Sequence, residues 1–154
     1  MAIDRRVEVA LDAPPVAVFE ALTDLDRWPE WLIASGIVRV TRVDPSGPVA
    51  AGSALRIEQR VAGRATTLDA RVTALATPEH FGVAGRDPDG VTVGIDAHLA
   101  PRDARTTLTW HLRITVPLRY RLFESMAAPQ VERAVRLDLE AFRRRLSTGA
   151  ATGD

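Results

Sequence analysis

Polar side chains within apolar stretches are the first candidates for chemistry in this sequence. Gln59 and Thr66 share the parity of the apolar residues on two neighbouring predicted strands, so both are expected to face inward. Asp138 lies in the apolar arc of a predicted helix, where a carboxylate is costly unless it is paired. It is interpreted either as a ligand-orienting or acid–base group or as the partner of an arginine at the sheet edge. We name Gln59 and Asp138 as candidate ligand-binding residues.

The three histidines are the first residues to consider as ligands of a metal ion. In the register that pairs Ala100 with Arg105, His98 and His111 share the outer face of one predicted hairpin. They then lie four residues apart along the ladder, about 13 Å at the usual strand rise, which is too far for one ion. His80 falls on another strand. The sequence therefore predicts no metal site.

Motifs for nucleophilic or cofactor chemistry do not occur in the chain. There is no Gly-x-Ser-x-Gly, no phosphate-binding loop and no cysteine. The predicted inner face carries no strand arginine, and the polar candidates near an expected cavity mouth are Arg119, Tyr120 and Arg121, which follow Pro117. We assign no catalytic residue and expect no cofactor.

Composition limits the class of protein. The chain has 154 residues, of which 46% are hydrophobic, which predicts one folded domain. A formal net charge of zero argues against a nucleic-acid partner. No apolar run reaches the roughly 18 residues of a membrane span, and the N-terminus lacks the apolar core of a signal peptide. We expect a cytoplasmic protein without a membrane span and leave its oligomeric state open.

The last long helix is the element that the rest of the chain must surround. Apolar residues recur there at spacings of 4, 4, 3 and 4 and form one stripe: Val131, Val135, Leu139, Phe142 and Leu146. The helix is predicted over Pro129–Leu146. The preceding segment Leu118–Ala128 is expected to be a loop with a short helix, and residues 147–154 a flexible tail.

Most of the chain before this helix alternates like β-strand. The predicted strands are Ile3–Leu11, Ile37–Val43, Leu55–Val61, Ala65–Leu75, a short one at Phe81 and Val83, Val91–Leu99 and Leu108–Val116. Between the first two strands, Asp12 before two prolines predicts one helix start, and Gly36 is expected to close a second short helix.

Two hairpin registers follow from matching the apolar faces. Pairing Val61 with Arg64 sets Ile57 opposite Leu68 and Leu55 opposite Ala70, and it also sets Arg56 opposite Asp69 on the other face. In the second hairpin, pairing Ala100 with Arg105 sets Ile95 opposite Trp110. Both registers gather apolar side chains on the face turned toward the helix.

This element order comes with the stretch Val9–Phe19 (VALDAPPVAVF), with Leu22 and Asp24, and with Trp28-Pro29 and Trp31. Together they resemble the START-like, or SRPBCC, superfamily of polyketide aromatase/cyclases, Bet v 1-type proteins, lipid-transfer domains and the Aha1-type co-chaperone domain. The resemblance implies an α+β helix-grip fold: a seven-stranded antiparallel sheet wrapped round a long C-terminal helix, with two short helices between strands 1 and 2. It covers about Ile3 to Leu146, so we expect one domain over residues 1–146.

The resemblance also implies a deep apolar cavity between sheet and helix, and we expect a ligand to contact the residues that face it. Besides Gln59 and Asp138, the candidate ligand-binding residues are Trp110, Trp31, Phe19, Leu55, Ile57, Leu68, Ala70, Phe81, Val83, Val93, Ile95, Leu112, Met126, Val131, Val135, Leu139 and Phe142. Trp110 is the first choice among them, whereas Trp28 is interpreted as a plug at the core edge.

Three functions fit this interpretation. The leading one is a non-enzymatic carrier or sensor of a small hydrophobic molecule, lipid-like or polyketide-like. The first alternative is a polyketide aromatase/cyclase or dehydratase that works by positioning and general acid–base help. The second is an Aha1-type protein-interaction module. A carrier needs a mostly apolar cavity, a cyclase needs convergent polar groups inside it, and an interaction module needs a filled core with an exposed apolar patch.

Overall fold

The computed structural model describes the backbone of residues 2–61 and 63–152 and the side chains of residues 3–61, 63–120 and 127–148. Seven antiparallel strands form one sheet in the order β1-β7-β6-β5-β4-β3-β2. The strands are β1 (Ala2–Leu11), β2 (Ile37–Arg42), β3 (Ala54–Val61), β4 (Arg64–Ala76), β5 (His80–Arg86), β6 (Thr92–Arg102) and β7 (Arg105–Thr115). The predicted helix-grip fold is confirmed.

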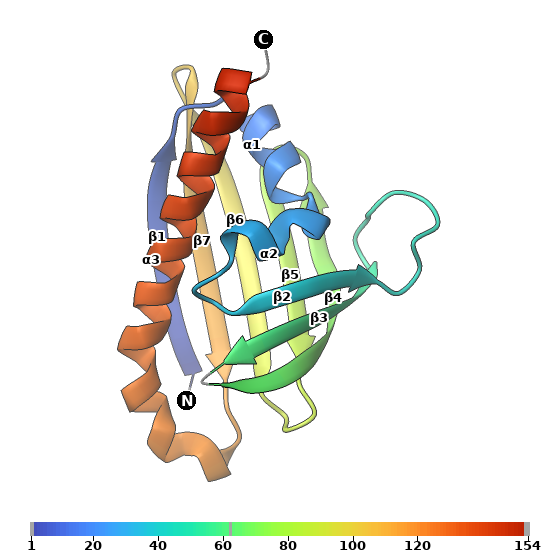
Figure 1. The fold of residues 1–154 in the computed structure, drawn as a ribbon, viewed down its shortest axis with the longest axis vertical. Helices are drawn as coiled ribbons and strands as arrows, with labels where there is room; N and C mark the ends of the chain where they lie inside the picture. The colour runs from blue at the N-terminus through green and yellow to red at the C-terminus, as the bar shows by residue number, and fades with distance from the viewer. Residues whose placement is uncertain (1, 62, 153–154) are drawn as a thin grey trace.

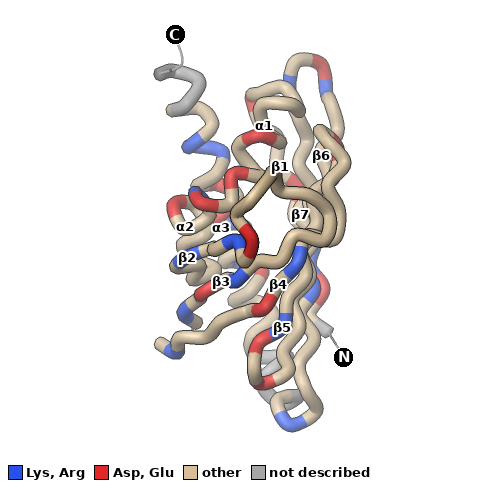
Figure 2. The backbone as a smooth tube through the Cα atoms, turned by 90° about the vertical axis from the view of Figure 1, so that its right-hand side faces the viewer, with Lys and Arg blue, Asp and Glu red and all other residues tan. Residues whose placement is uncertain are grey.

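The helices lie on one face of this curved sheet (Figure 1). They are α1 (Pro15–Leu22), the 3-10 turn η1 (Leu25–Arg27), α2 (Trp28–Trp31), the 3-10 turn η2 (Leu118–Tyr120) and α3 (Arg121–Thr152). Viewed from the side, basic and acidic residues are interspersed along the strands and loops, with no block of one sign (Figure 2). Exposed residues alternate with buried ones along the middle of β4, so the sheet has one solvated outer face and one buried inner face.

The core lies between the sheet and the apolar stripe of α3. Val135, Leu139 and Phe142 are each at most 3% exposed. They pack in one cluster with side chains of the sheet, among them Leu108 and Trp110 of β7. Burying each such side chain stabilises the fold by about 1.5–3 kcal/mol. The stripe predicted from spacing is the one that anchors α3.

The start and end of α3 differ from the prediction. The helix begins at Arg121 and continues to Thr152, past Leu146, with Pro129 inside it. Because proline has no N–H, Pro129 cannot donate to the preceding turn, and proline is a common cause of helix bending. Figure 1 shows the first turns of α3 at an angle to the rest. Pro129 therefore bends the helix and does not start it.

Asp12 does not cap α1. The N-cap is Pro14, which has no side chain able to accept a hydrogen bond. The Asp12 carboxylate lies instead 2.9 Å from Arg105 Nε, at the start of β7. The prolines located the helix correctly, whereas Asp12 forms an ion pair that links the end of β1 to the start of β7.

The second hairpin is tighter than predicted. Arg102 pairs with Arg105, so the turn contains only Asp103, at φ 57°, and Ala104. Trp110 consequently lies opposite Ala97, two positions from the predicted Ile95. The error arises because a shift of two residues leaves every side chain on its predicted face, so the apolar pattern cannot detect it. The first hairpin has the predicted register throughout.

Gly36 joins α2 to the sheet at a close backbone contact. Its φ is +78°, and a Cβ there would lie 2.1 Å from the Arg60 carbonyl oxygen. The Arg60 N–H donates to the Gly36 carbonyl at 2.8 Å. Only glycine fits both the dihedral and the space, so β2 is held against β3 at this point.

Candidate functional site

A cavity of about 590 Å³ lies between the sheet and α3. Strands β2 to β7 supply much of its wall, α3 supplies Ala127, Gln130, Val131 and Ala134, and the α2 region supplies Trp28, Leu32, Ala34 and Ser35. The curved sheet leaves a gap beneath α3, and the small side chains of Ala127 and Ala134 on α3 help to keep this gap open. We call this space the cavity.

Part of the predicted ligand set lines the cavity. These residues are Trp110, Ile57, Gln59, Leu68, Val83, Val93, Ile95, Leu112 and Val131. Others lie in the packed part of the core and do not line it: Trp31, Phe19, Leu55, Ala70, Phe81, Val135, Asp138, Leu139 and Phe142. The side chain of Met126 lies outside the described residues.

Aromatic packing explains why one half of the core is filled. The ring of Trp31 lies 4.7 Å from Phe142 and 5.7 Å from Trp110, measured between centroids. Trp28 lies 6.2 Å from Phe81 in an edge-to-face contact, and its Nε1 donates to the Leu22 carbonyl at 2.8 Å. These rings separate the filled half near α1 from the hollow half. Trp28 therefore plugs the core edge as interpreted, and it also lines the cavity.

Gln59 and Thr66 place polar atoms on the cavity wall. They are cross-strand neighbours in the β3–β4 ladder, as predicted, and both line the cavity. The amide offers two N–H donors and a carbonyl acceptor, and the hydroxyl can donate or accept. A mostly apolar wall with a few fixed polar groups is the usual composition of a small-molecule site.

Charged residues form one end of the cavity, at the hairpin ends. Arg60, Arg64, Asp87 and Asp89 all contribute to the lining. Strand parity predicted that Arg60 faces outward. Arg60 lies near the end of β3, beside the hairpin turn, and there it lines the cavity. We call this charged end of the cavity the rim. Arg60 and Arg64 flank the turn of the first predicted hairpin, and Asp87 and Asp89 lie between two predicted strands.

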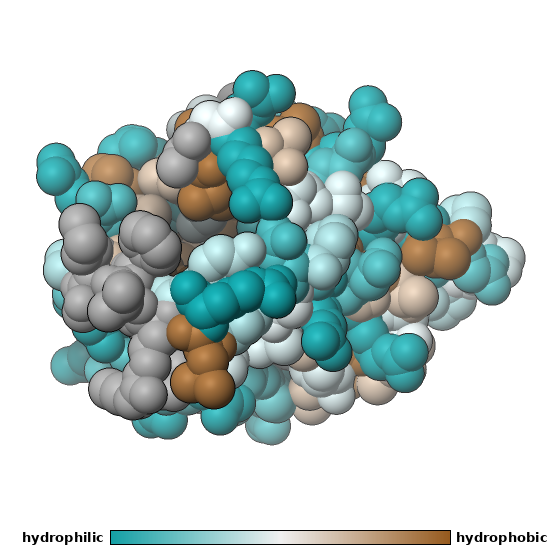
Figure 3. Space-filling model, turned by 90° about the horizontal axis from the view of Figure 1, so that it is seen from below, coloured by the Kyte–Doolittle hydropathy of each residue, from teal (hydrophilic) through white to brown (hydrophobic). Residues whose placement is uncertain are grey.

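The rim contains an ion pair between two hairpins. Arg64 Nη2 lies 2.7 Å from Asp89 Oδ2, and Arg119 of η2 donates to the Asp89 carbonyl at 2.6 Å. The Asp87 carboxylate accepts from the N–H groups of Asp89 and Val91, both at 2.9 Å, and so fixes the turn. Seen from this end, most of the described surface is hydrophilic (Figure 3). Arg119, predicted near the mouth, thus ties η2 to the rim.

Asp138 is a structural anchor and does not line the cavity. Its Oδ1 accepts from the Ala34 N–H at 2.7 Å and its Oδ2 from the Ser35 N–H at 2.9 Å. Burial raises the pKa of the Asp138 carboxyl above its ordinary value, and the hydrogen bonds from Ser35 and Ala34 oppose the rise. The expected arginine partner is replaced by backbone N–H donors, which a sequence pattern does not reveal.

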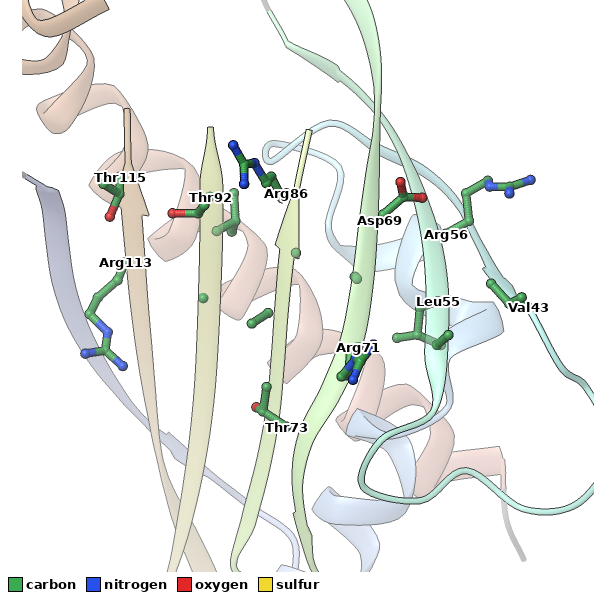
Figure 4. A pocket seen from close by; sticks show the side chains of 16 residues that line it. Val43, Leu55, Arg56, Asp69, Arg71, Thr73, Arg86, Thr92, Arg113 and Thr115 are labelled. Carbon is green, nitrogen blue, oxygen red and sulfur yellow. The ribbon is translucent and has the colours of Figure 1, made fainter. Parts of the chain in front are cut away.

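A second hollow, of about 830 Å³, lies on the outer face of the sheet. Figure 4 shows its lining on the side of the sheet away from the helices. Its floor is Ala84 and Gly94, which form one cross-strand row with Arg71 and Arg113. Because this hollow is open to water, an apolar ligand would remain partly hydrated there. The cavity is therefore the better candidate site.

A curved antiparallel sheet around a C-terminal helix, with an apolar cavity between them, defines the helix-grip class of α+β folds. Residues 2–147 match the family model for polyketide cyclase/dehydrase and lipid transport proteins. The chain belongs to this family. No functionally curated protein matches the sequence.

Solved structures of other proteins share this fold. The Zhui aromatase/cyclase from Streptomyces sp. R1128 superposes with a TM-score of 0.82 at 17% identity, covering 99% of this chain and 98% of that one. A START superfamily protein from Mycobacterium smegmatis superposes with a TM-score of 0.75 at 15% identity, covering 94% and 97%. At such identities these structures establish the fold. Within the described residues, none of the helices is long and apolar enough to cross a membrane.

Proposed function

We propose that the protein binds a small hydrophobic molecule, lipid-like or polyketide-like, in the cavity. The observation that carries the proposal is a space of about 590 Å³ walled by Trp110, Ile57, Leu112 and other apolar side chains. This volume lies within the range of about 300–1,000 Å³ that is common for small-molecule sites. The family description, which includes lipid transport, supports the same class of ligand.

The wall chemistry suggests the kind of molecule. Each Å² of apolar ligand surface that leaves water contributes about 25 cal/mol. Gln59 and Thr66 offer hydrogen bonds at one part of the wall. The wall therefore suits a ligand with an apolar body and one polar group that pairs with these side chains. An indole at Trp110 favours a flat or unsaturated body.

Binding is tested on tag-free protein by native mass spectrometry, followed by denaturing release of bound molecules and by titration with an anilinonaphthalene-sulfonate probe. Ala134→Phe adds a ring to the wall on α3 and is expected to abolish probe binding. Leu137→Phe is the matched control, since Leu137 lies on the same helix and is 55% exposed. Equal probe binding by wild type and Ala134→Phe would refute the site.

A polyketide aromatase/cyclase or dehydratase is the second candidate. Arg60 and Arg64 line the cavity, although strand parity placed no arginine inside. Basic groups near an apolar space can stabilise an enolate, and positioning supplies much of the rate in such reactions. Incubation with a poly-β-ketone thioester tests this candidate. A changed ratio of ring-closed products, lost in Arg60→Met, supports catalysis, whereas an unchanged ratio supports binding alone.

A further inference from the structure

We propose that His80, Asp96 and His98 form a binding site for one divalent transition-metal ion, of the zinc type, on the outer face of the sheet. Their potential ligand atoms all lie within 4.8 Å of one another. His80 Nε2 is 2.7 Å from Asp96 Oδ1, and the rings of His80 and His98 are stacked with centroids 4.2 Å apart. The site is separate from the cavity, because all three residues have outer parity.

The true strand register brings these residues together. His80 of β5 lies directly opposite His98 of β6, and Asp96 lies two positions along β6 on the same face. The prediction of no metal site considered only His98 and His111 together, in a register that is two residues out, and left His80 apart. The long spacing predicted between His98 and His111 therefore says nothing about His80 and His98, which are cross-strand neighbours in β5 and β6.

The donor set suits a borderline divalent ion. Two imidazole nitrogens and one carboxylate oxygen are a common three-ligand set for zinc, with water completing the shell. Ligand atoms of a tetrahedral zinc lie about 3.4 Å apart, so modest side-chain rotation closes the present spacing. His98 is exposed, and His80 and Asp96 are only partly buried, so an ion reaches them without opening the fold.

The Asp96 carboxylate lies against a glycine of the neighbouring strand. Gly82 is the cross-strand neighbour of Asp96, and a Cβ on Gly82 would lie 2.8 Å from Asp96 Oδ1 and 2.5 Å from Thr73 Oγ1. Glycine at position 82 therefore lets the Asp96 carboxylate and the Thr73 hydroxyl approach the β5 backbone, where a side chain would collide with both. In Figure 4 the Thr73 side chain lies over the neighbouring strand, on the outer face.

Neighbouring charges set the expected strength. Arg113 Nη2 lies 3.8 Å from Asp96 Oδ2, which leaves Oδ1 as the oxygen that faces His80. Arg6 also contributes positive charge near His98. These guanidinium groups repel a divalent cation and weaken its binding. We therefore expect a micromolar dissociation constant for the metal ion.

The test is equilibrium dialysis of the tag-free protein against Zn²⁺, with the visible spectrum of the Co²⁺ form as the second readout. The expected result is one bound equivalent and the absorption bands of a four-coordinate cobalt ion. His80→Ala and His98→Ala are each expected to weaken binding by at least about tenfold. His98→Gln provides a second variant, and circular dichroism checks that each variant is folded.

His111→Ala is the matched control. His111 lies on the same face, but its Nε2 is 2.7 Å from Asp4 Oδ1, and it is not part of the cluster. Full zinc binding by this variant, with loss in the other two, supports the site. Substoichiometric binding by the wild type at saturating Zn²⁺, or equal binding by all histidine variants, overturns it.

Discussion

The carboxylate of Asp138 on α3 holds the backbone of Ser35, its Oδ2 lying 2.9 Å from the Ser35 nitrogen. Its other oxygen holds Ala34 at 2.7 Å. Both residues line the cavity, so α3 positions the α2–β2 connection through one side chain. Asp138 therefore positions two lining residues without lining the cavity itself.

Asp138→Ala is expected to lower the free energy of unfolding by at least about 2 kcal/mol, because two backbone N–H groups lose their acceptor in a partly buried place. Asp138→Asn keeps one acceptor oxygen and is expected to cost less. Urea denaturation measures both. A loss for alanine below that of asparagine would contradict the anchoring role.

Gly36→Ala is expected to destabilise the fold by more than about 2 kcal/mol, because it combines positive φ with a clash. Gly47→Ala is a close control: Gly47 also has a φ of +78°, but nothing lies within 4 Å of a Cβ there. Its cost should be only about 1 kcal/mol, from the dihedral alone. Thermal unfolding of the two variants separates strain from clash, and equal losses would show that the contact with Arg60 does not matter.

The pKa of His98 is expected to lie below its ordinary value of 6.5, because partial burial disfavours the charged ring and His80, Arg6 and His111 add repulsion that outweighs Asp96. A folded-state pKa below that of the unfolded chain means that protonation favours unfolding. This contribution to stability is complete above pH 6.5 and is lost as pH falls through the folded pKa. Titration of the imidazole signals by NMR measures the shift, and a value above 6.5 would contradict it.

The Arg64–Asp89 pair at the rim is expected to contribute less than about 1 kcal/mol to stability, because Arg64 is 71% exposed at its side chain. Its effect should appear instead in ligand exchange. Arg64→Ala unties the two hairpins and is expected to raise the rate at which the fluorescent probe leaves the cavity. Stopped-flow dilution measures this rate, with Arg71→Ala on the outer face as the control. An equal change in both variants would argue against a role for the pair.

Gln59→Leu tests the polar part of the wall. The substitution keeps roughly the same volume and removes the amide, so ligands with a polar group should bind about 5–30-fold more weakly, the equivalent of one lost hydrogen bond of about 1–2 kcal/mol. Purely apolar ligands should bind at least as well as before. Isothermal titration with a fatty acid and with an alkane-like analogue makes the comparison.

Periodicity located the elements because burial imposes it directly. The stripe from Val131 to Leu146 and the faces of β3 and β4 follow from one requirement, that apolar side chains leave water. The same rule did not fix the β6–β7 register, since a shift of two residues leaves each face unchanged. That shift placed His98 opposite Thr107 in place of Thr109, and the β5–β6 register that sets His98 opposite His80 was not predicted from the sequence.

The candidate site was only partly predictable for a similar reason. A strand pattern says that Leu55 and Leu68 both face inward, yet only Leu68 lines the cavity. Which inward side chains pack and which face open space depends on the aromatic contacts of Trp31 with Phe142 and Trp110. Such contacts join α2, α3 and β7, which are far apart in the sequence. Local patterns carry no information about them.

The sheet order also has a consequence for how the chain folds. In the part of the chain that the structure describes, β1 pairs only with β7, so that Val7 meets Trp110. During synthesis the first strand has no partner until most of the chain has left the ribosome. Contacts between such distant segments slow folding, because a long loop must close first. The β1 edge, with its free backbone N–H and C=O groups, is therefore the segment that most needs protection from aggregation in the newly made chain.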